Sequence, residues 1–548
     1  MSPSVTTTPT LAPVLKKILI ANRGEIAVRV IRAAREMGIP TVAVYSELDR
    51  DSLHVRLADE AYALGGQTAA ESYINTDVML DVIRQSGADS VHPGYGFFSE
   101  NADFARAIGE MGVEFIGPPP SAMDEMSDKV SSRLAAIRGG APVVPGTTEF
   151  AKGPDDIKAF GNEFGWPVCI KAAFGGGGRG MKVVQAEAEV DDAMASAQRE
   201  AKAFFGRDEV YVERYLTWPR HVEIQLVGDK HGNCVWISSR DCSAQRRHQK
   251  LVEEAPAPNL PEGLEQAMGE AAVKAATAVG YYSAGTVEFI FQDGDFFFLE
   301  MNTRLQVEHP VTEAVTGVDL VEWQFRVAAG EPMPLKQDQI KLDGWAMEAR
   351  LYAEDPANGF LPSIGKLTHF ELPEDIRIDT GVEQGGEVSQ FYDPMIAKLI
   401  VHEETRVEAA AALAIAASEV EVWPVKTNAA FVMKCLEHPR FIAGDVDTGF
   451  IAAEEDDLTA APLSPLGLED AARFLRAGTA ASAGDDHASP WDGWSGAIGF
   501  FAYDVVRHIE KLPHAPPRAL NYPDACFVFT KALVVIDNWR GQARVIVS

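Results

Sequence analysis

The stretch that decides the fold of the N-terminal region is KILIANRGEIAVRVIRAAREMGIPTVAVY, residues 17–45. Residues 17–21 form an apolar run that is typical of a buried strand. Four apolar residues then recur at helical spacing, namely Ile26, Val30, Ala34 and Met37. The sequence Gly38-Ile39-Pro40 ends this helix, and residues 41–45 are expected to form the next strand. Strand, helix and strand at this spacing predict a parallel α/β domain, in which ligands bind at the carboxyl ends of the strands.

Polar segments occupy the expected strand ends of this domain. Residues 22–25 (NRGE) follow the first strand, and residues 92–101 (HPGYGFFSEN) fall at another strand end. Farther along, apolar runs predict more strands in HVEIQLVGD, GNCVWISSRDCS, AGTVEFIFQ and DFFFLEMN, and residues 407–420 predict an alanine-rich helix. We therefore expect an α/β protein, α+β overall, whose later parts are rich in strands.

Composition excludes several functional classes. The 548 residues contain 49 Lys and Arg against 80 Asp and Glu, a formal net charge of −31 that disfavours nucleic acid and anionic membranes as partners. The five cysteines lie far apart without a CxxC pair, so neither a disulfide framework nor a zinc site is indicated. Residues 1–15 lack the pattern of a signal peptide, and no apolar run approaches the roughly 18 residues of a membrane span. We expect a cytoplasmic protein of three to five structural units.

A glycine-rich loop, FGGGGRG at residues 174–180, is the most conspicuous motif. Successive glycines let backbone N–H groups approach phosphate oxygens closely. The loop lacks the Walker A pattern, and a plain flexible turn is the alternative interpretation. Phosphate binding is favoured by Lys171, which precedes the loop on an expected strand, and by Lys129 farther upstream.

Two acidic residues interrupt apolar strands in a pattern that predicts a metal site. Glu288 and Glu300 are expected on adjacent antiparallel strands joined at Asp293-Gly294. With Asn302 they offer two carboxylates and an amide oxygen, a set suited to Mg²⁺ (or Mn²⁺) bridging ATP phosphates. A solvent-facing acidic hairpin is the alternative, but an unpaired charge inside FFFLEM would be costly.

Four longer motifs occur in order along the chain: GGGGRGM, RHVEIQ, DCSAQRRHQKLVEEAP and EMNTRLQVEHPVTE. Together they resemble the ATP-grasp biotin carboxylases, the first-step enzymes of acetyl-CoA, propionyl-CoA and pyruvate carboxylases, from about residue 16 to residue 451. The resemblance implies an N-terminal α/β domain at 14–127, an ATP-grasp domain at 128–334 with a mobile lid at about 142–210, and a mixed, β-rich C-terminal domain at 335–452.

The resemblance also implies where ATP binds. The implied ATP contacts are Lys129, Lys171, Gly176, Gly177, Gly178, Glu213, Leu216, His221, Gln245 and His248, with Glu213 and Leu216 in the segment that holds adenine. The basic patch RRHQK at 246–250 would trap anions in an otherwise acidic chain. Its alternative is an exposed, salt-bridged strand.

The site for bicarbonate and biotin is implied next. Its residues are Lys250, Arg304, Gln306, Val307, Glu308 and Arg350, of which Lys250, Arg304, Glu308 and Arg350 are the implied catalytic residues. Glu308 is the expected general base for bicarbonate, and Arg350 the expected stabiliser of the biotin enolate. The implied reaction makes carboxyphosphate from ATP and bicarbonate and then carboxylates biotin, while closure of the lid excludes water.

Biotin is normally attached to a lysine in an Ala-Met-Lys-Met context, which these 548 residues lack. The expected partners are therefore a biotin carboxyl carrier protein, on a separate chain or a missing segment, and a carboxyltransferase subunit. Bicarbonate is the expected substrate, and a homodimer or a larger hetero-oligomer the expected assembly. The final acyl acceptor is not evident from the sequence.

The last hundred residues differ in character. Residues 453–490 are polar and acidic with several prolines, and they are expected to form a linker. Residues 491–548 are expected to form a small β-rich module, and SGAIGFFAYDVVRHIEKLP within them resembles the N-terminal part of anthranilate synthase component I. Because the half that holds that family's catalytic residues is absent, we expect no chorismate chemistry.

Two other functions compete with biotin carboxylation. One is an ATP-grasp ligase for carbamoyl or amino-acid substrates, against which RLQVEHPVTE and RRHQK count. The other is a catalytically silent scaffold, against which the competent residue at every expected catalytic position counts. Bicarbonate-dependent ATP hydrolysis stimulated by free biotin separates all three.

Overall fold

The computed structural model describes residues 15–459 and the backbone of four strands between 498 and 547. Within 15–459 it leaves out residues 128, 148, 174–179 and 248, and the side chains of 129, 130 and 205. The chain divides into two compact units, Met1–Leu458 and Thr459–Ser548.

The first unit begins with a five-stranded parallel sheet in the order β3-β2-β1-β4-β5. Its strands are β1 (Ile18–Ile20), β2 (Thr41–Tyr45), β3 (Glu60–Ala63), β4 (Ser90–His92) and β5 (Glu114–Phe115). Its helices are α1 (Gly24–Glu36), α2 (Leu53–Leu57), α3 (Thr76–Ser86), α4 (Ala102–Glu110) and α5 (Pro120–Ser127). The predicted strands at 17–21 and 41–45 and the helix between them are present, which confirms the parallel α/β arrangement.

The carboxyl ends of β1 and β4 meet because the two strands are neighbours. Asn22 follows β1, and its Nδ2 atom donates to the carbonyls of Pro93 (2.7 Å) and Tyr95 (2.8 Å) after β4. Gly94 has a φ of 64°, and a Cβ there would lie 2.8 Å from Asn22 Nδ2, so the close approach requires glycine. The two polar segments singled out in the sequence are thus hydrogen-bonded to each other.

An antiparallel sheet of eight strands forms the middle of the unit, in the order β13-β12-β9-β10-β11-β14-β21-β19. Its strands are β9 (Arg220–Gly228), β10 (Cys234–Arg246), β11 (Gln249–Ala255), β12 (Ser283–Gln292), β13 (Asp295–Asn302), β14 (Trp345–Tyr352), β19 (Arg377–Thr380) and β21 (Met395–Glu403). The predicted hairpin is β12–β13, turning at Asp293 and Gly294. Pairing of β11 with β14 continues one sheet across residue 334, where the sequence predicts a domain boundary.

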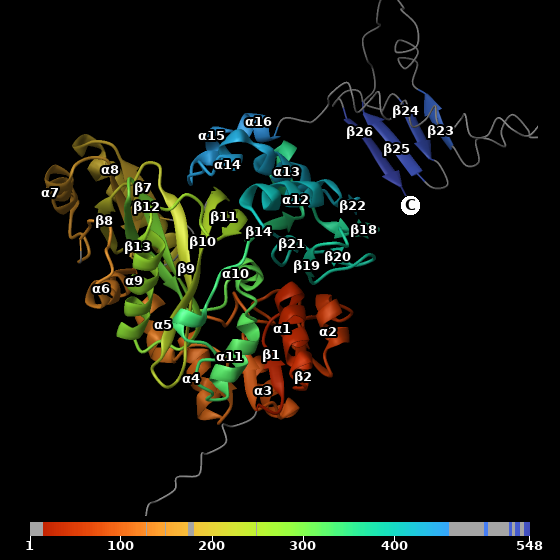
Figure 1. The fold of residues 1–548 in the computed structure, drawn as a ribbon, viewed down its shortest axis with the longest axis horizontal. Coiled ribbons are helices and arrows are strands. Elements are labelled where there is room, and N and C mark those ends of the chain that lie inside the picture. Colours follow the sequence, from red (N-terminus) through yellow and green to blue (C-terminus); the bar gives the residue numbers. More distant parts are fainter. Residues whose placement is uncertain are drawn as a thin grey trace, which may run out of the picture. The chain divides into compact units, whose positions relative to one another are not determined.

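Helices cover this sheet on both faces. On β11 and β14, one face packs against α10 (His309–Thr316), and the opposite face packs against α12 (Arg406–Ser418) and α13 (Ala429–Glu437) (Figure 1). The other helices of this part are α6 (Lys129–Gly139), α9 (Leu264–Ala278), α11 (Leu320–Ala328), α14 (Pro439–Ile442), α15 (Phe450–Ala453) and α16 (Glu455–Thr459). Polar residues on these strands are consequently deeply buried.

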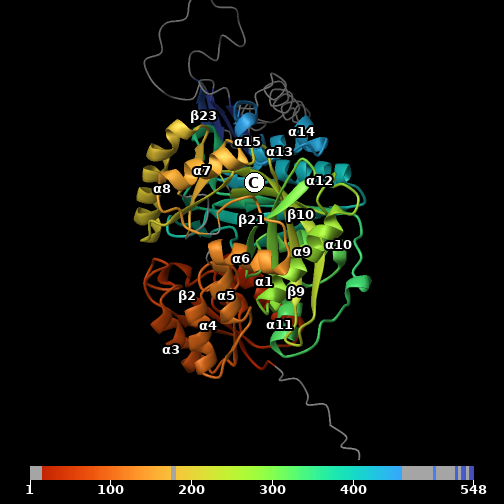
Figure 2. The ribbon, with the colours of Figure 1, turned by 90° about the vertical axis from the view of Figure 1, so that its left-hand side faces the viewer.

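The predicted lid contains a separate small sheet, β7-β6-β8, with its own core. Its elements are α7 (Pro154–Phe164), β6 (Val168–Ala172), β7 (Met181–Val184), α8 (Val190–Phe205) and β8 (Val210–Arg214). Figure 2 shows α7 and α8 above the N-terminal sheet. The glycine-rich loop between β6 and β7 lies outside the described residues apart from Gly180.

Short strand pairs follow β14 in the first unit. They are β15 (Glu354–Asp355) with β16 (Leu361–Pro362), β17 (Gly365–Lys366) with β20 (Glu387–Val388), and β18 (His369–Glu371) with β22 (Glu421–Trp423). The predicted linker at 453–490 begins within folded structure, because α16 includes Leu458, whose side chain is buried in the core. The rest of that segment lies outside the described residues.

The second unit contains a four-stranded antiparallel sheet in chain order. Its strands are β23 (Ile498–Phe501), β24 (Ala525–Val528), β25 (Ala532–Asp537) and β26 (Gln542–Val547). These strands agree with the β-rich module expected at 491–548.

Candidate active site

Lys250 on β11 is the centre of a buried cluster of carboxylates. Its Nζ atom lies 2.5 Å from Glu308 Oε1, 2.7 Å from Glu223 Oε2 and 3.0 Å from Glu288 Oε1. All four residues are buried or nearly so. Burial lowers the pKa of the Lys250 amine, but the surrounding acids raise it well above its usual range. Lys250 is therefore a permanent cation that draws three acids together.

Glu308 lies in the turn before α10 and is fully buried between two cations. Lys250 contacts Oε1, and the NH2 nitrogen of Arg350 on β14 donates to Oε2 over 3.0 Å. Burial raises the pKa of Glu308, but Lys250 and Arg350 outweigh it and leave the pKa well below its usual range. The structure thus unites Glu308, Lys250 and Arg350, which the sequence predicted to act together.

Lys250 and Arg350 each contact a further acid, Glu223 and Glu253 respectively, for which the sequence predicted no role. Arg350 donates from Nε to Glu253 Oε1 over 2.6 Å. Glu223 Oε1 accepts from Arg240 Nε, leaving its Oε2 for Lys250. Arg240 is completely buried, and its other donors reach Gln225, Thr286 and Thr312. A charge in an apolar strand such as HVEIQLV was the available sequence signal for Glu223, since it requires a buried partner.

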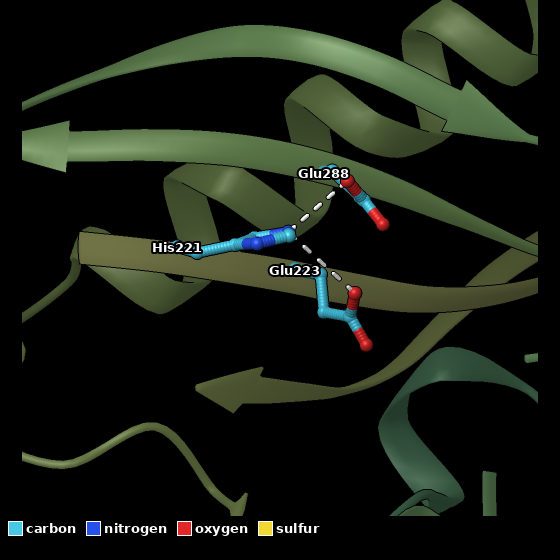
Figure 3. A group of neighbouring side chains, drawn as sticks. All are labelled: His221, Glu223 and Glu288. Carbon is cyan, nitrogen blue, oxygen red and sulfur yellow. Dashed lines mark ion pairs between the residues drawn. The ribbon is translucent and has the colours of Figure 1, made fainter. Parts of the chain in front are cut away.

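His221 on β9 faces the same cluster (Figure 3). Its Nε2 atom lies 3.1 Å from Glu288 Oε2 and 3.9 Å from Glu223 Oε2. Burial lowers the pKa of His221, but Glu288 raises it and the net direction is upward. Gln245 Nε2 lies 3.3 Å from His221 Nδ1. Two predicted ATP contacts therefore touch each other beside Glu288.

The predicted metal ligands lie on paired strands. Glu288 and Glu300 are register partners, so their side chains project from the same face of the hairpin. Asn302 turns its Nδ2 atom to Glu288 Oε1 (2.8 Å) and accepts a bond from Arg304 at its Oδ1 atom (3.1 Å). Among the described residues, the possible ligand atoms that converge with Glu288 within 4.8 Å are those of His221 and Glu223, not Glu300. Paired carboxylates nevertheless fit a hard divalent cation such as Mg²⁺.

Arg304 joins this site to the N-terminal domain. Its NH1 atom donates to Gln306 Oε1 (3.0 Å), and its Nε atom donates to Glu100 Oε2 (3.2 Å). Glu100 also accepts from the backbone of Thr303 (3.0 Å). Glu100 belongs to the polar segment 92–101, so a strand end of the first sheet fixes the predicted bicarbonate arginine. The carbonyl of Val307 accepts from the buried amine of Lys398 over 2.9 Å.

Other predicted ATP residues lie in the lid or close to it in the chain. Lys171 on β6 pairs with Glu213 on β8, with Nζ 2.5 Å from Oε2. Glu213 also accepts from Arg133 of α6 (2.8 Å). Leu216 is half-buried in the segment after β8. The remaining predictions, Gly176, Gly177, Gly178, His248 and the side chain of Lys129, lie outside the described residues.

Three family models match consecutive parts of the chain. Residues 14–123 match the biotin carboxylase N-terminal domain, 128–336 the ATP-binding domain of the carbamoyl-phosphate synthase L chain, and 348–453 the biotin carboxylase C-terminal domain. Over 440 residues the chain is 49% identical to the biotin carboxylase of Halalkalibacterium halodurans, covering 80% of this chain and 97% of that protein. The chain belongs to the biotin carboxylase family.

Other relatives of the chain are longer. The mitochondrial methylcrotonoyl-CoA carboxylase subunit alpha of Dictyostelium discoideum is 50% identical over 490 residues, which cover 88% of this chain and 70% of that subunit. Across the alpha subunits that match first, the chain spans 61–70% of their length. A solved dimer of the biotin carboxylase domain of Hydrogenobacter thermophilus 2-oxoglutarate carboxylase, with MgADP, ADP and bicarbonate, superposes with a TM-score of 0.79. It is 42% identical and covers 82% of this chain and 100% of that domain.

This membership confirms the predicted enzyme class, an ATP-dependent ligase, and its association with ATP, Mg²⁺ and biotin. The α/β fold with an ATP-grasp domain is confirmed as well. Among the described residues, no helix combines the length and the apolar character that crossing a bilayer demands.

Proposed function

We propose that the chain catalyses the first half-reaction of a biotin-dependent acyl-CoA carboxylase, in which ATP and bicarbonate carboxylate biotin on a carrier protein. The observation that carries this proposal is the arrangement at Glu308. A fully buried carboxylate is contacted on one oxygen by Lys250 and on the other by Arg350. An anionic substrate that binds to one of these cations would weaken its contact with the carboxylate. The carboxylate could then accept a proton.

Glu308 is the proposed general base. Between two cations it is fully ionised but weakly basic, because Lys250 and Arg350 stabilise its charge. A bicarbonate ion that binds next to Lys250 would draw this cation away from Glu308. The carboxylate then becomes basic enough to take the bicarbonate proton. The coupling makes the base active only when its substrate is present.

Arg304 is the proposed bicarbonate clamp, and Lys250 completes it. The NH1 and NH2 nitrogens of Arg304 donate to Gln306 and Asn302, and the side-chain amides of these two residues donate in turn to Glu288. An arginine fork suits the two oxygens of bicarbonate, and it remains charged at every working pH. Gln306 and the backbone at Val307 are proposed to fix the orientation of the anion.

Arg350 is proposed to serve the second chemical step. Negative charge develops on the ureido oxygen of biotin when N1′ loses its proton, and a fixed cation stabilises this enolate before it attacks CO₂. Once Glu308 has accepted a proton, it no longer neutralises the NH2 group of Arg350. The arginine charge is then available to the biotin oxygen. Protonation of Glu308 in the first step would thus prepare Arg350 for the second.

The nucleotide is proposed to lie between the lid and the central sheet. Lys171, His221 and Gln245 would contact it, with Lys129, Gly176, Gly177, Gly178 and His248 completing the phosphate site and Glu213 and Leu216 near adenine. Glu288 and Glu300, with Asn302, would hold Mg²⁺, which neutralises charge on the phosphates when bound. Domain boundaries are proposed at 14–127, 128–334 and 335–452, with a lid at about 142–210.

The expected partners are a biotin carboxyl carrier protein and a carboxyltransferase subunit, and the expected assembly is a homodimer or a larger complex. An acyl-CoA acceptor is proposed because the alpha subunits that match this chain carry acyl-CoA carboxylase names. A cytoplasmic location stays a prediction; several of these relatives are named mitochondrial.

Bicarbonate-dependent ATP hydrolysis by the full chain, with and without free biotin, tests the proposal. Stimulation by both ligands is expected. Turnover that ignores bicarbonate but responds to an amino acid would support a different ATP-grasp ligase. Complete inactivity of a folded sample would support a silent scaffold. Glu163→Gln, a change of an exposed lid residue, is the matched control.

A further inference from the structure

Two acids behind Arg350 have no role in the reaction described above. Glu253 on β11 and Glu348 on β14 are register partners, so their side chains emerge on the same face with Cβ atoms about 4.5–5.5 Å apart. Both side chains are completely buried. Helix α10 covers this face, where its residues Val311 and Val315 pack on Ala255 and Ala346, the register pair two positions along from the two acids. Two carboxylates therefore lie side by side on one buried face of the sheet, away from water.

The contacts of the two acids are unequal. Glu253 Oε1 accepts from Arg350 Nε over 2.6 Å. Glu253 Oε2 and both oxygens of Glu348 have no hydrogen-bond partner among the described residues. The nearest cation on the next strand is Lys398, which is the register partner of Arg350. Its amine contacts three other oxygens, those of Val307 (2.9 Å), Glu25 (3.3 Å) and Asp379 (3.7 Å).

The electrostatic surroundings do not supply a cation for each acid. Burial raises the pKa of Glu348 well above its usual range, against Lys398 and Arg350, and it raises the pKa of Glu253 as well. The charged and titratable groups that interact with the pair are Arg350, Lys398, Lys250, Glu308, Cys242 and Tyr352, and His309 is the buried histidine of the covering helix α10. Burial holds the pKa of His309 well below its usual range, so α10 contributes no positive charge here. Two adjacent buried carboxylates in such surroundings cannot both ionise cheaply.

We propose that Glu253 and Glu348 hold one proton between them, and that protonated Glu348 is a positioning residue for Arg350. The O–H of Glu348 donates to the free Oε2 of Glu253. Glu253 is then an anion with both oxygens occupied, one by Glu348 and one by Arg350. Its fixed orientation aims the terminal nitrogens of Arg350 at Glu308 and at the biotin site. This inference rests on the proposed function of Arg350.

The shared proton makes the arrangement sensitive to alkaline pH. Loss of the proton places a second full charge beside Glu253. The new anion competes for Arg350 and for Lys398, and Lys398 also holds the carbonyl of Val307 next to Glu308. Loss of the proton is therefore expected to weaken two contacts at the catalytic base at once, that of Arg350 with Glu308 and that of Lys398 with the adjacent Val307 carbonyl. Glu348→Gln keeps a donor toward Glu253 but removes the group that ionises.

Infrared spectroscopy of the full chain tests the proton without any activity. At neutral pH the wild type is expected to show the C=O stretch of a protonated, buried carboxylic acid, which Glu348→Gln removes and Glu163→Gln leaves in place. A band of equal size in wild type and Glu348→Gln would overturn the proposal. This measurement keeps its meaning even if the chain proves to have no carboxylase activity.

Kinetics test the positioning role. Glu348→Gln is expected to keep most of the biotin carboxylation rate and to lose the alkaline decline of the wild type. Glu348→Leu, which has no donor, is expected to lose about 10- to 100-fold in kcat, as misplaced catalytic groups do, with a smaller loss in bicarbonate-dependent ATP cleavage. Melting temperatures of both variants show whether they fold. Wild-type activity in a folded Glu348→Leu would overturn the role, as would an equal loss in both variants. A wild type without bicarbonate-dependent turnover would instead overturn the proposed function.

Discussion

The amine of Lys250 lies 2.5 Å from Oε1 of Glu308, although 58 positions separate the two residues in the chain. The same amine lies 3.0 Å from Glu288, a predicted metal ligand. A change of charge at Glu288 therefore reaches the base through one shared cation. Metal binding and base strength are expected to depend on each other at this site.

Replacing the base tests the centre of the site. Glu308→Gln is expected to keep ATP binding and to lose bicarbonate-dependent turnover by about 10²–10⁴-fold, because the amide fills the space but cannot accept a proton. Nucleotide binding by titration and steady-state ATPase rates measure the two effects. The exposed Glu163→Gln should match the wild type in both. Undiminished turnover in Glu308→Gln would refute the assignment of the base.

A second variant tests whether Glu300 is a ligand of Mg²⁺. Glu300→Gln is expected to raise the Mg²⁺ concentration needed for half-maximal turnover by at least about tenfold, since an anionic ligand is lost. The measurement is a Mg²⁺ titration of ATPase activity at saturating ATP and bicarbonate. A curve that overlays the wild type would show that the cation binds without Glu300, as the convergence of Glu288 with His221 and Glu223 also allows.

Arg350 is expected to separate the two half-reactions. Arg350→Ala should retain part of the bicarbonate-dependent ATP cleavage and make little carboxybiotin, because the charge for the biotin oxygen is gone. One of the two cations that lower the pKa of Glu308 is also gone, so this pKa should rise. The acid limb of the pH–rate profile for ATP cleavage should therefore move to higher pH. Arg350→Lys keeps the charge and should keep that limb near its wild-type position. Parallel loss of both activities in Arg350→Ala would contradict the division of labour.

Because His92 is buried in its neutral form, the free energy of unfolding is expected to fall in mild acid. Burial lowers the pKa of His92 to about 4, and the neutral ring accepts from Gly94 N–H at Nδ1 while Nε2 lies 3.0 Å from Gln324 Oε1. The unfolded chain takes up this proton below about 6.5. The contribution of neutral His92 to the free energy of unfolding is therefore complete above about pH 6.5. It is lost as the pH falls toward 4, at about 1.4 kcal/mol per pH unit.

Urea unfolding at pH 7 and pH 5 measures this effect. His92→Gln should make the stability less dependent on pH over that interval, whereas His231→Gln, a change of an exposed histidine, should leave the dependence as in the wild type. Equal pH dependence in His92→Gln and the wild type would show that another group dominates the acid response.

The sequence predicted several strands and two helices because local patterns specify them. Residues 41–45 coincide with β2, and the turn at Asp293-Gly294 does join β12 to β13. Motif order then predicted Lys250, Glu308 and Arg350, which the fold brings into contact. Their supporting acids escaped prediction because their partners are distant in the chain. Glu253 binds Arg350 from 97 positions away, and Glu100 reaches Arg304 across 204 positions. Only pairing of the strands and packing of the domains create such contacts.

The C-terminal boundary shows the same limit of sequence patterns. The acidic composition after residue 452 suggested a linker, but Leu458 is 3% exposed and belongs to the same core as Phe431 and Phe450. The amine of Lys434 on α13 also donates to the carbonyl of Asp457, over 3.3 Å. Composition cannot reveal that one apolar residue in an acidic segment enters a core.

Truncation within this segment gives the final prediction. A chain that ends at Thr459 keeps α16 and should retain the melting temperature and the biotin-stimulated ATPase activity of the full chain. A chain that ends at Ala453 loses Leu458, and removal of a buried leucine side chain costs about 2–5 kcal/mol. Its melting temperature should therefore fall clearly below that of the longer truncation. Identical melting of the two truncated chains would show that α16 adds nothing to the core. An insoluble or inactive chain ending at Thr459 would show instead that the carboxylase unit requires residues beyond 459.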